Sequence, residues 1–145
     1  IKKRSLTMIE KFNNIFYLTI YLVHFAGVGM YAFQTIINTK KFMKKFGIDK
    51  SGAIVVRFAG AFLFAVFLMS VYVGFVRPGG LNATWAFFNL VFINNLCILL
   101  CNYYSIKVDK TGVSKKTSME PIYGPLAFTI MSAILCYGLA DKIYV

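Results

Sequence analysis

His24 is the only histidine of the chain, and it lies within a long apolar run. Ionisable side chains inside a membrane are costly to bury and are therefore candidates for function. Small residues follow at Ala26, Gly27 and Gly29, and such residues let a flat macrocycle approach a helix backbone. His24 is thus a candidate ligand for haem or chlorophyll, with a second chain supplying the other axial ligand of a bis-histidine haem. The alternative, which we favour, is a neutral His24 hydrogen-bonded to an asparagine of the third apolar run or to a backbone carbonyl.

Arg57 is the only charged residue well inside a candidate membrane span. Because successive spans alternate in direction, its end of the second span lies on the same side of the membrane as Glu120. That carboxylate precedes Pro121 at the start of the fourth span, where it also complements the helix dipole. We expect an ion pair between Arg57 and Glu120. The alternative is that Arg57 extends its aliphatic stem toward a lipid phosphate.

The third apolar run is free of charge but rich in asparagine. Side-chain amides in a membrane helix hydrogen-bond to neighbouring helices, at about 0.6–2 kcal/mol each. We expect this packing role, in preference to a substrate pathway, for the four amides Asn89, Asn94, Asn95 and Asn102.

No catalytic set accompanies these residues. The sequence lacks the HExxH, Walker A, GxSxG and CxxC motifs, and its one histidine leaves no pair for nucleophilic catalysis. Cys97, Cys101 and Cys136 lie inside apolar runs without metal-ligand spacing. We therefore expect no catalytic residue and no metal site.

The composition indicates the elements that position these residues. Of 145 residues, 59% are hydrophobic and 14% charged, and the mean hydropathy is +0.68. A membrane-spanning helix needs about 20 mostly apolar residues. Four stretches qualify, at residues 13–37, 53–76, 81–106 and 122–140. The sequence predicts an all-α fold, a four-helix transmembrane bundle that forms one domain over residues 1–145.

The connection at residues 39–50 differs from the others because it is basic and amphipathic. A helix over 39–46 places its apolar residues Phe42, Met43 and Phe46 on one side. Its basic residues on the other side are Lys40, Lys41, Lys44 and Lys45. Such a segment is suited to lipid headgroups, and the alternative is a solvated lysine loop.

The net charge of +11 lies mainly in the connections. We interpret it as contact with anionic lipids rather than with nucleic acid. Nine Lys or Arg residues in the first and third connections, against six in the other connection and the ends, favour both termini on the outer side. The chain begins at Ile1 with a basic segment that lacks the apolar core of a secretory signal. This beginning is compatible with a trimmed organellar presequence.

Two segments carry a resemblance to a known group. These are FGIDKSGAIVVRFAGA, which enters the second span with Arg57 and Gly60, and KKTSMEPIYG, which enters the fourth. In this layout the chain resembles the small DoxX-like four-helix membrane proteins. The resemblance implies a four-helix bundle and transfers no catalytic residue.

We therefore predict a non-catalytic accessory subunit bound to other membrane subunits. Its expected setting is an energy-transducing complex of the respiratory, ATP synthase or photosystem type, in the mitochondrial inner membrane or thylakoid. The aromatic content of 17%, more than four helices need to pack against one another, favours such partners. The alternatives are a stand-alone DoxX-like transporter or redox-linked membrane enzyme, and a haem- or chlorophyll-carrying subunit.

Overall fold

The computed structural model describes residues 7–111, 113–114 and 117–145, and this part of the chain is helical without strands. Four helical segments are long and apolar enough to cross a membrane, namely Ile15–Ile36, Lys50–Val76, Trp85–Asp109 and Glu120–Gly138. The predicted all-α four-helix membrane fold is confirmed.

Capping residues explain where the first helices begin or end. Helix α1 (Met8–Lys11) starts with a capping box between Thr7 and Glu10. Helix α2 (Ile15–Ile36) is capped at its N-terminus by Asn14, whose side chain accepts two backbone N–H bonds. Helix α3 (Thr39–Phe46) ends at Gly47, whose φ of +67° costs a glycine little.

The later spans extend beyond their regular α-helical parts. Helix α4 (Ala53–Val71) follows a short 3-10 turn at Lys50–Gly52 and continues as a π-helical turn, Tyr72–Val76. Helix α5 (Trp85–Tyr103) likewise continues through the π-helical turn Tyr104–Asp109. Helix α6 (Glu120–Gly138) is followed by the single-turn helix α7 (Ala140–Ile143).

The predicted third span began too early. Helix α5 starts at Trp85 rather than Leu81, because residues 81–84 belong to the turn that follows α4. Within that turn Ala83 has a φ of +54°, and its N–H donates to the carbonyl oxygen of Lys142 at 3.2 Å. Apolar composition alone does not separate these turn residues from the helix.

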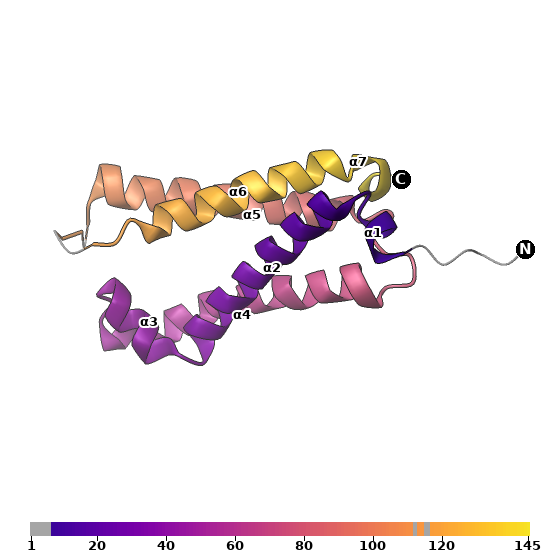
Figure 1. Cartoon of the computed structure of the whole chain (residues 1–145). Helices are drawn as coiled ribbons and strands as arrows, with labels where there is room; N and C mark the ends of the chain where they lie inside the picture. Colours follow the sequence, from indigo (N-terminus) through magenta and orange to yellow (C-terminus); the bar gives the residue numbers. More distant parts are fainter. Residues whose placement is uncertain (1–6, 112, 115–116) are drawn as a thin grey trace, which may run out of the picture.

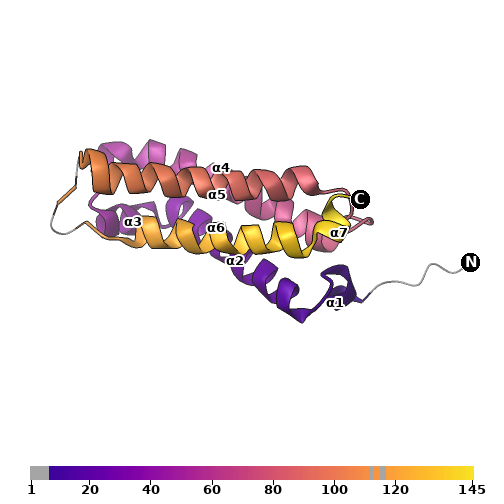
Figure 2. The same cartoon turned by 90° about the horizontal axis from the view of Figure 1, so that it is seen from above.

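The bundle consists of two helix pairs. Helix α2 packs along α4, α5 packs along α6, and the pairs are joined mainly by contacts between α2 and α6. Figure 1 shows α1, α7 and the turn between α4 and α5 at one end of the molecule, and α3 at the other end. Seen from above in Figure 2, α2 crosses beneath the long axis of α5 and α6. The two pairs diverge toward the end that carries α3.

The packed core lies at the end that carries α7. Tyr21 is 1% exposed, and its hydroxyl donates to the carbonyl oxygen of Ser70 at 2.6 Å, which fastens α2 to α4. Around it gather buried residues from most helices, including Phe12, Phe25, Phe88, Leu135, Leu139 and Ile143. This end is therefore filled by side chains.

The basic connection forms the helix α3 with the predicted bounds 39–46. Met43 is buried, Phe42 and Phe46 are partly buried, and the four lysines are exposed. Its contact with lipid stays a prediction. So does the orientation of the termini, for which the counted residues Lys2, Lys3, Arg4, Lys115 and Lys116 lie outside the described residues.

Candidate functional site

A cavity of about 610 Å³ lies between the two helix pairs, in the half of the molecule that carries α3. This volume is within the range of about 300–1,000 Å³ that is usual for small-molecule sites. The helix pairs diverge here, and the side chains that meet across the bundle do not fill the space between them. Its wall from α4 is apolar and consists of Val55, Val56, Ala59, Phe62 and Leu63.

The opposite wall carries hydrogen-bonding groups. Helix α5 contributes Asn94, Asn95 and Asn102, and the first turn of α6 contributes Glu120. From α2 come Tyr31 and Thr35. The cavity is thus mostly apolar, since Ile98, Pro125 and Phe128 also line it, and it carries a few hydrogen-bonding groups, as a site for an amphipathic molecule would.

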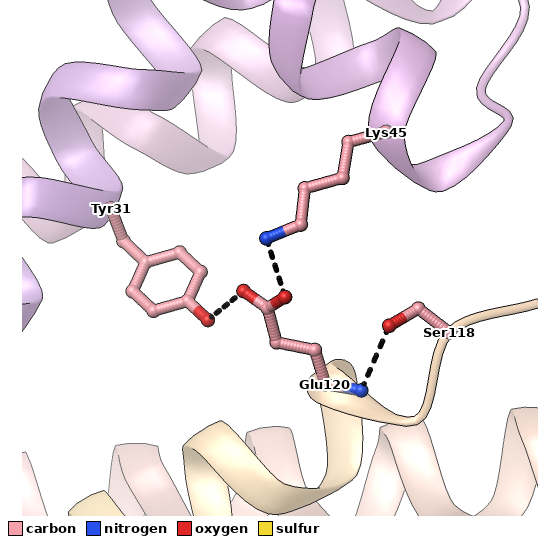
Figure 3. A network of polar contacts seen from close by, with 4 residues as sticks. All are labelled: Tyr31, Lys45, Ser118 and Glu120. Atoms are coloured by element: carbon pink, nitrogen blue, oxygen red, sulfur yellow. Dashed lines mark hydrogen bonds and ion pairs between the residues drawn. The ribbon is translucent and has the colours of Figure 1, made fainter.

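Glu120 links three helices at the mouth of the cavity (Figure 3). One of its carboxylate oxygens lies 2.5 Å from the Lys45 ammonium of α3, and the other accepts a 2.7 Å hydrogen bond from the Tyr31 hydroxyl of α2. The backbone N–H of Glu120 donates to the Ser118 hydroxyl at 3.1 Å. These bonds connect the α2–α4 side of the cavity to the α5–α6 side.

The expected ion pair between Arg57 and Glu120 does not form. Among the described residues the ion-pair partner of Glu120 is Lys45. Arg57 is exposed, and its Nε donates to the Thr39 hydroxyl at 3.2 Å, at the junction of α2 and α3. Alternation of the spans placed both residues correctly at one end of the bundle, but it does not specify the direction in which a helix face points. Lys45, for which the sequence predicts a contact with lipid headgroups, supplies the charge instead.

Deeper in the bundle, Asn95 brings together side chains of three helices. Its Nδ2 lies 2.9 Å from the Nε2 of His24 in α2, 3.2 Å from the Ser132 hydroxyl in α6 and 3.3 Å from the carbonyl oxygen of Phe128. An amide nitrogen only donates, so Nε2 of His24 accepts and the ring proton lies on Nδ1. Nδ1 is buried and has no hydrogen-bond partner in the described part of the chain.

The surroundings of His24 do not fit a haem or chlorophyll. The side chain is completely buried, and the rings of Phe25 and Phe128 pack edge-on against it at centroid distances of 4.6 and 5.3 Å. The space beside Gly27, which a macrocycle would need, is occupied by Phe128, and a Cβ at that glycine would lie 2.7 Å from its ring. The histidine instead has the hydrogen bond to an asparagine of the third span.

The other asparagines of α5 differ in their partners. Nδ2 of Asn102 donates to the carbonyl oxygen of Pro121 at 2.7 Å, so it joins α5 to α6. Oδ1 of Asn89 accepts a 2.8 Å bond from the Tyr144 hydroxyl at the other end of the bundle. Asn94 makes no hydrogen bond with any described residue, although the structure places it in the cavity wall. Three of the four amides therefore have the expected partners in other segments.

The structure adds contacts that the sequence did not indicate. Tyr31 and Ser118 were not singled out, because a tyrosine in an apolar run and a serine in a loop are unremarkable by type. Ser132, which Asn95 contacts from α5, was likewise not predicted to make a polar contact. In the described residues no three His, Cys, Asp or Glu side chains are grouped so that they could hold a metal ion.

Comparison with protein-family models, with curated proteins and with solved structures finds no match. The likeness to DoxX-like proteins therefore remains a prediction from the two sequence segments.

Proposed function

We propose that this chain is a non-catalytic membrane protein that binds an amphipathic, lipid-like molecule in the cavity between its helix pairs. The observation that carries the proposal is the cavity itself, about 610 Å³ in size, with an apolar wall on α4 and amides on α5. Most of the lining consists of apolar side chains, such as Val56, Phe62 and Leu63. A bound molecule with an apolar body would cover this surface and gain contacts with it.

Binding is favoured over transport by what lies beneath the cavity. The half of the bundle that carries α7 is filled by a core that includes Tyr21, Phe25, Phe88 and Leu135. A transported molecule would have to pass through this packed region. The diverging half offers a place to stay rather than a route across the bundle.

The proposal is tested by filling the cavity. Ala59 lines it from α4, whereas Ala61, two residues along the same helix and exposed like Ala59, is not part of the wall. The protein, reconstituted in nanodiscs, is irradiated with photoactivatable hexadecanol and hexadecanoic acid, and the labelled peptides are identified by mass spectrometry. We expect labelling of cavity residues that Ala59→Trp reduces at least about fivefold, equivalent to about 1 kcal/mol, and that Ala61→Trp leaves unchanged. Labelling that is absent from the cavity with both probes, or equal in the two variants, would contradict the proposal.

We also propose that the protein works as an accessory subunit of a larger energy-transducing complex in an organellar membrane. The supporting observation is the position of α4, which among the long helices packs chiefly on α2 and leaves Ile54, Phe58 and Leu68 exposed. A partner helix or lipid would cover this face. Migration in blue-native electrophoresis tests the idea: an assembly much larger than the 16.4 kDa chain is expected, and migration as a monomer would contradict it.

A further inference from the structure

We infer that the molecule bound in the cavity is an uncharged lipid alcohol, whose hydroxyl group is held at mid-membrane depth by Asn94 and Asn95. This inference rests on the proposed binding function and specifies the chemical class of the ligand. It follows from hydrogen-bonding capacity that the protein leaves unused at the floor of the cavity.

Asn94 provides the first part of that capacity. It lies at the middle of α5, is partly buried and lines the cavity, yet no described residue hydrogen-bonds to its amide. In hydrocarbon no water is at hand to satisfy such a group, and an unsatisfied polar group there is unfavourable. An amide with one free donor and one free acceptor side is therefore suited to a polar group of a ligand.

Asn95 provides the second part. Its Nδ2 faces His24, Ser132 and the Phe128 carbonyl oxygen, which fixes the orientation of the amide. No described residue donates to its Oδ1, and the residue lines the cavity. The floor thus offers acceptors from two adjacent asparagines and a donor from Asn94. A hydroxyl group donates and accepts at once, so it matches this arrangement better than a carbonyl group, which only accepts.

The charge distribution excludes an ionised group at the floor. Among the described residues of the cavity wall, Glu120 is the only charged one; it lies at the mouth, and Lys45 already neutralises it. Asn94 is eight residues from Asn102, or about 12 Å along the helix, and Asn102 is bonded to Pro121 beside the mouth. A carboxylate or ammonium group placed at Asn94 would find no free counter-charge among the described residues that line the cavity, because Arg57 of the second span is not part of its wall. The ligand that fits is neutral at its deep end and apolar along α4.

The experiment compares two probes that differ only in the head group. Hexadecanol and hexadecanoic acid each carry a diazirine beside the head group, and labelled peptides report where that group lies. We expect the alcohol to label residues around Asn94 and Asn95, and the acid to label the mouth near Lys45. Asn94→Leu should reduce labelling by the alcohol about three- to tenfold, as expected for one lost hydrogen bond. Asn89→Leu, on the same helix but outside the cavity wall, should leave it unchanged.

Thermal unfolding separates this role from a structural one. Asn94 has no described partner, so Asn94→Leu should not lower Tm. Replacement of an amide with a structural role would lower it. Equal labelling of the floor by both probes, or alcohol labelling that survives Asn94→Leu, overturns the lipid-alcohol assignment while leaving the cavity as a binding site. If neither probe labels the cavity, the binding function itself is overturned. Asn94→Ser keeps a hydroxyl at this position, and if it loses as much labelling as the leucine variant, the assignment is also wrong.

Discussion

The carboxylate of Glu120 lies 2.5 Å from the ammonium group of Lys45 and so joins α6 to α3 across the mouth of the cavity. The two side chains are 34% and 50% exposed. Solvent therefore screens the pair, and its contribution to stability is modest. Its position matters more. Helix α3 packs on α2 and α4, whereas α6 belongs to the other pair, so the ion pair links the two helix pairs.

A double-mutant cycle should measure this link. We expect Lys45→Met and Glu120→Gln to show a coupling of about 0.2–1 kcal/mol at low salt, decreasing as salt is added. Glutamine keeps an acceptor for the Tyr31 hydroxyl, so the cycle isolates the charge. The measurement is reversible unfolding in detergent at two ionic strengths. Lys44→Met, which removes an exposed lysine beside Lys45 on α3, is the control. Zero coupling between Lys45 and Glu120 at low salt would show that this ion pair does not hold the two sides of the mouth together.

A second prediction concerns the contact between α2 and α4. A Cβ at Gly60 would collide with the hydroxyl oxygen of Thr35. That oxygen is held in place by bonds to the carbonyl oxygens of Tyr31 and Ala32, at 2.8 and 3.0 Å. Gly60→Ala should therefore force the helices apart and destabilise the protein by about 1–3 kcal/mol.

Gly79→Ala is the matched control for this change. The nearest atom to a Cβ at Gly79 belongs to Arg77 at 3.7 Å, which is ordinary contact. Both variants are compared by their denaturation midpoints in the same detergent. Similar midpoints would mean that α2 and α4 tolerate a wider spacing at Gly60.

These contacts show how far the sequence predicted the structure. The four spans were recognisable because each needs a long apolar run, which few soluble segments have. The helix at 39–46 was recognisable because lysine and phenylalanine alternate with helical periodicity. Arg57 and Glu120 were correctly placed at one end of the bundle. Their pairing was wrong because hydropathy gives the depth of a residue and not the direction of its side chain.

The cavity was beyond sequence reasoning for a related reason. Asn94 and Asn95 are adjacent in sequence but point about 100° apart on a helix. Asn95 is hydrogen-bonded to α2 and α6, whereas Asn94 is bonded to no described residue. Which of them meets His24 depends on how α5 is rotated against α2 and α6. The divergence of the helix pairs, which creates the cavity, likewise depends on tertiary packing.

A third prediction concerns the buried pair of His24 and Asn95. Asn95→Leu leaves the imidazole buried without its partner, so we expect destabilisation of about 1–3 kcal/mol. Replacing both residues, as His24→Leu with Asn95→Leu, removes both polar groups and should recover part of the loss. Unfolding free energies of the two single variants and the double variant provide the measurement. Strictly additive losses would show that the two side chains do not interact.

Absorption spectroscopy gives an independent check on the same histidine. Because the ring is enclosed by Phe25 and Phe128, we expect the purified protein to show neither a Soret nor a chlorophyll band. A band that disappears in His24→Ala would mean that the helices separate to admit a pigment. Asn89→Ala, distant from the histidine, serves as the control for a general loss of folding.

The last prediction concerns the lysines of α3. Lys40, Lys41 and Lys44 are exposed on this short helix, whereas Met43 is buried against the protein. A basic face anchored in this way should concentrate anionic lipid, at about 1 kcal/mol per lysine near the surface. We expect replacement of these three lysines by glutamine to lower the ratio of phosphatidylglycerol to phosphatidylcholine that remains bound to protein extracted from mixed membranes. Lys45 is left unchanged because Glu120 requires it. Replacement of the same three lysines by arginine keeps the charge and should keep the lipid ratio. If the glutamine variant retains the wild-type ratio, α3 is a solvated loop helix and not a lipid contact.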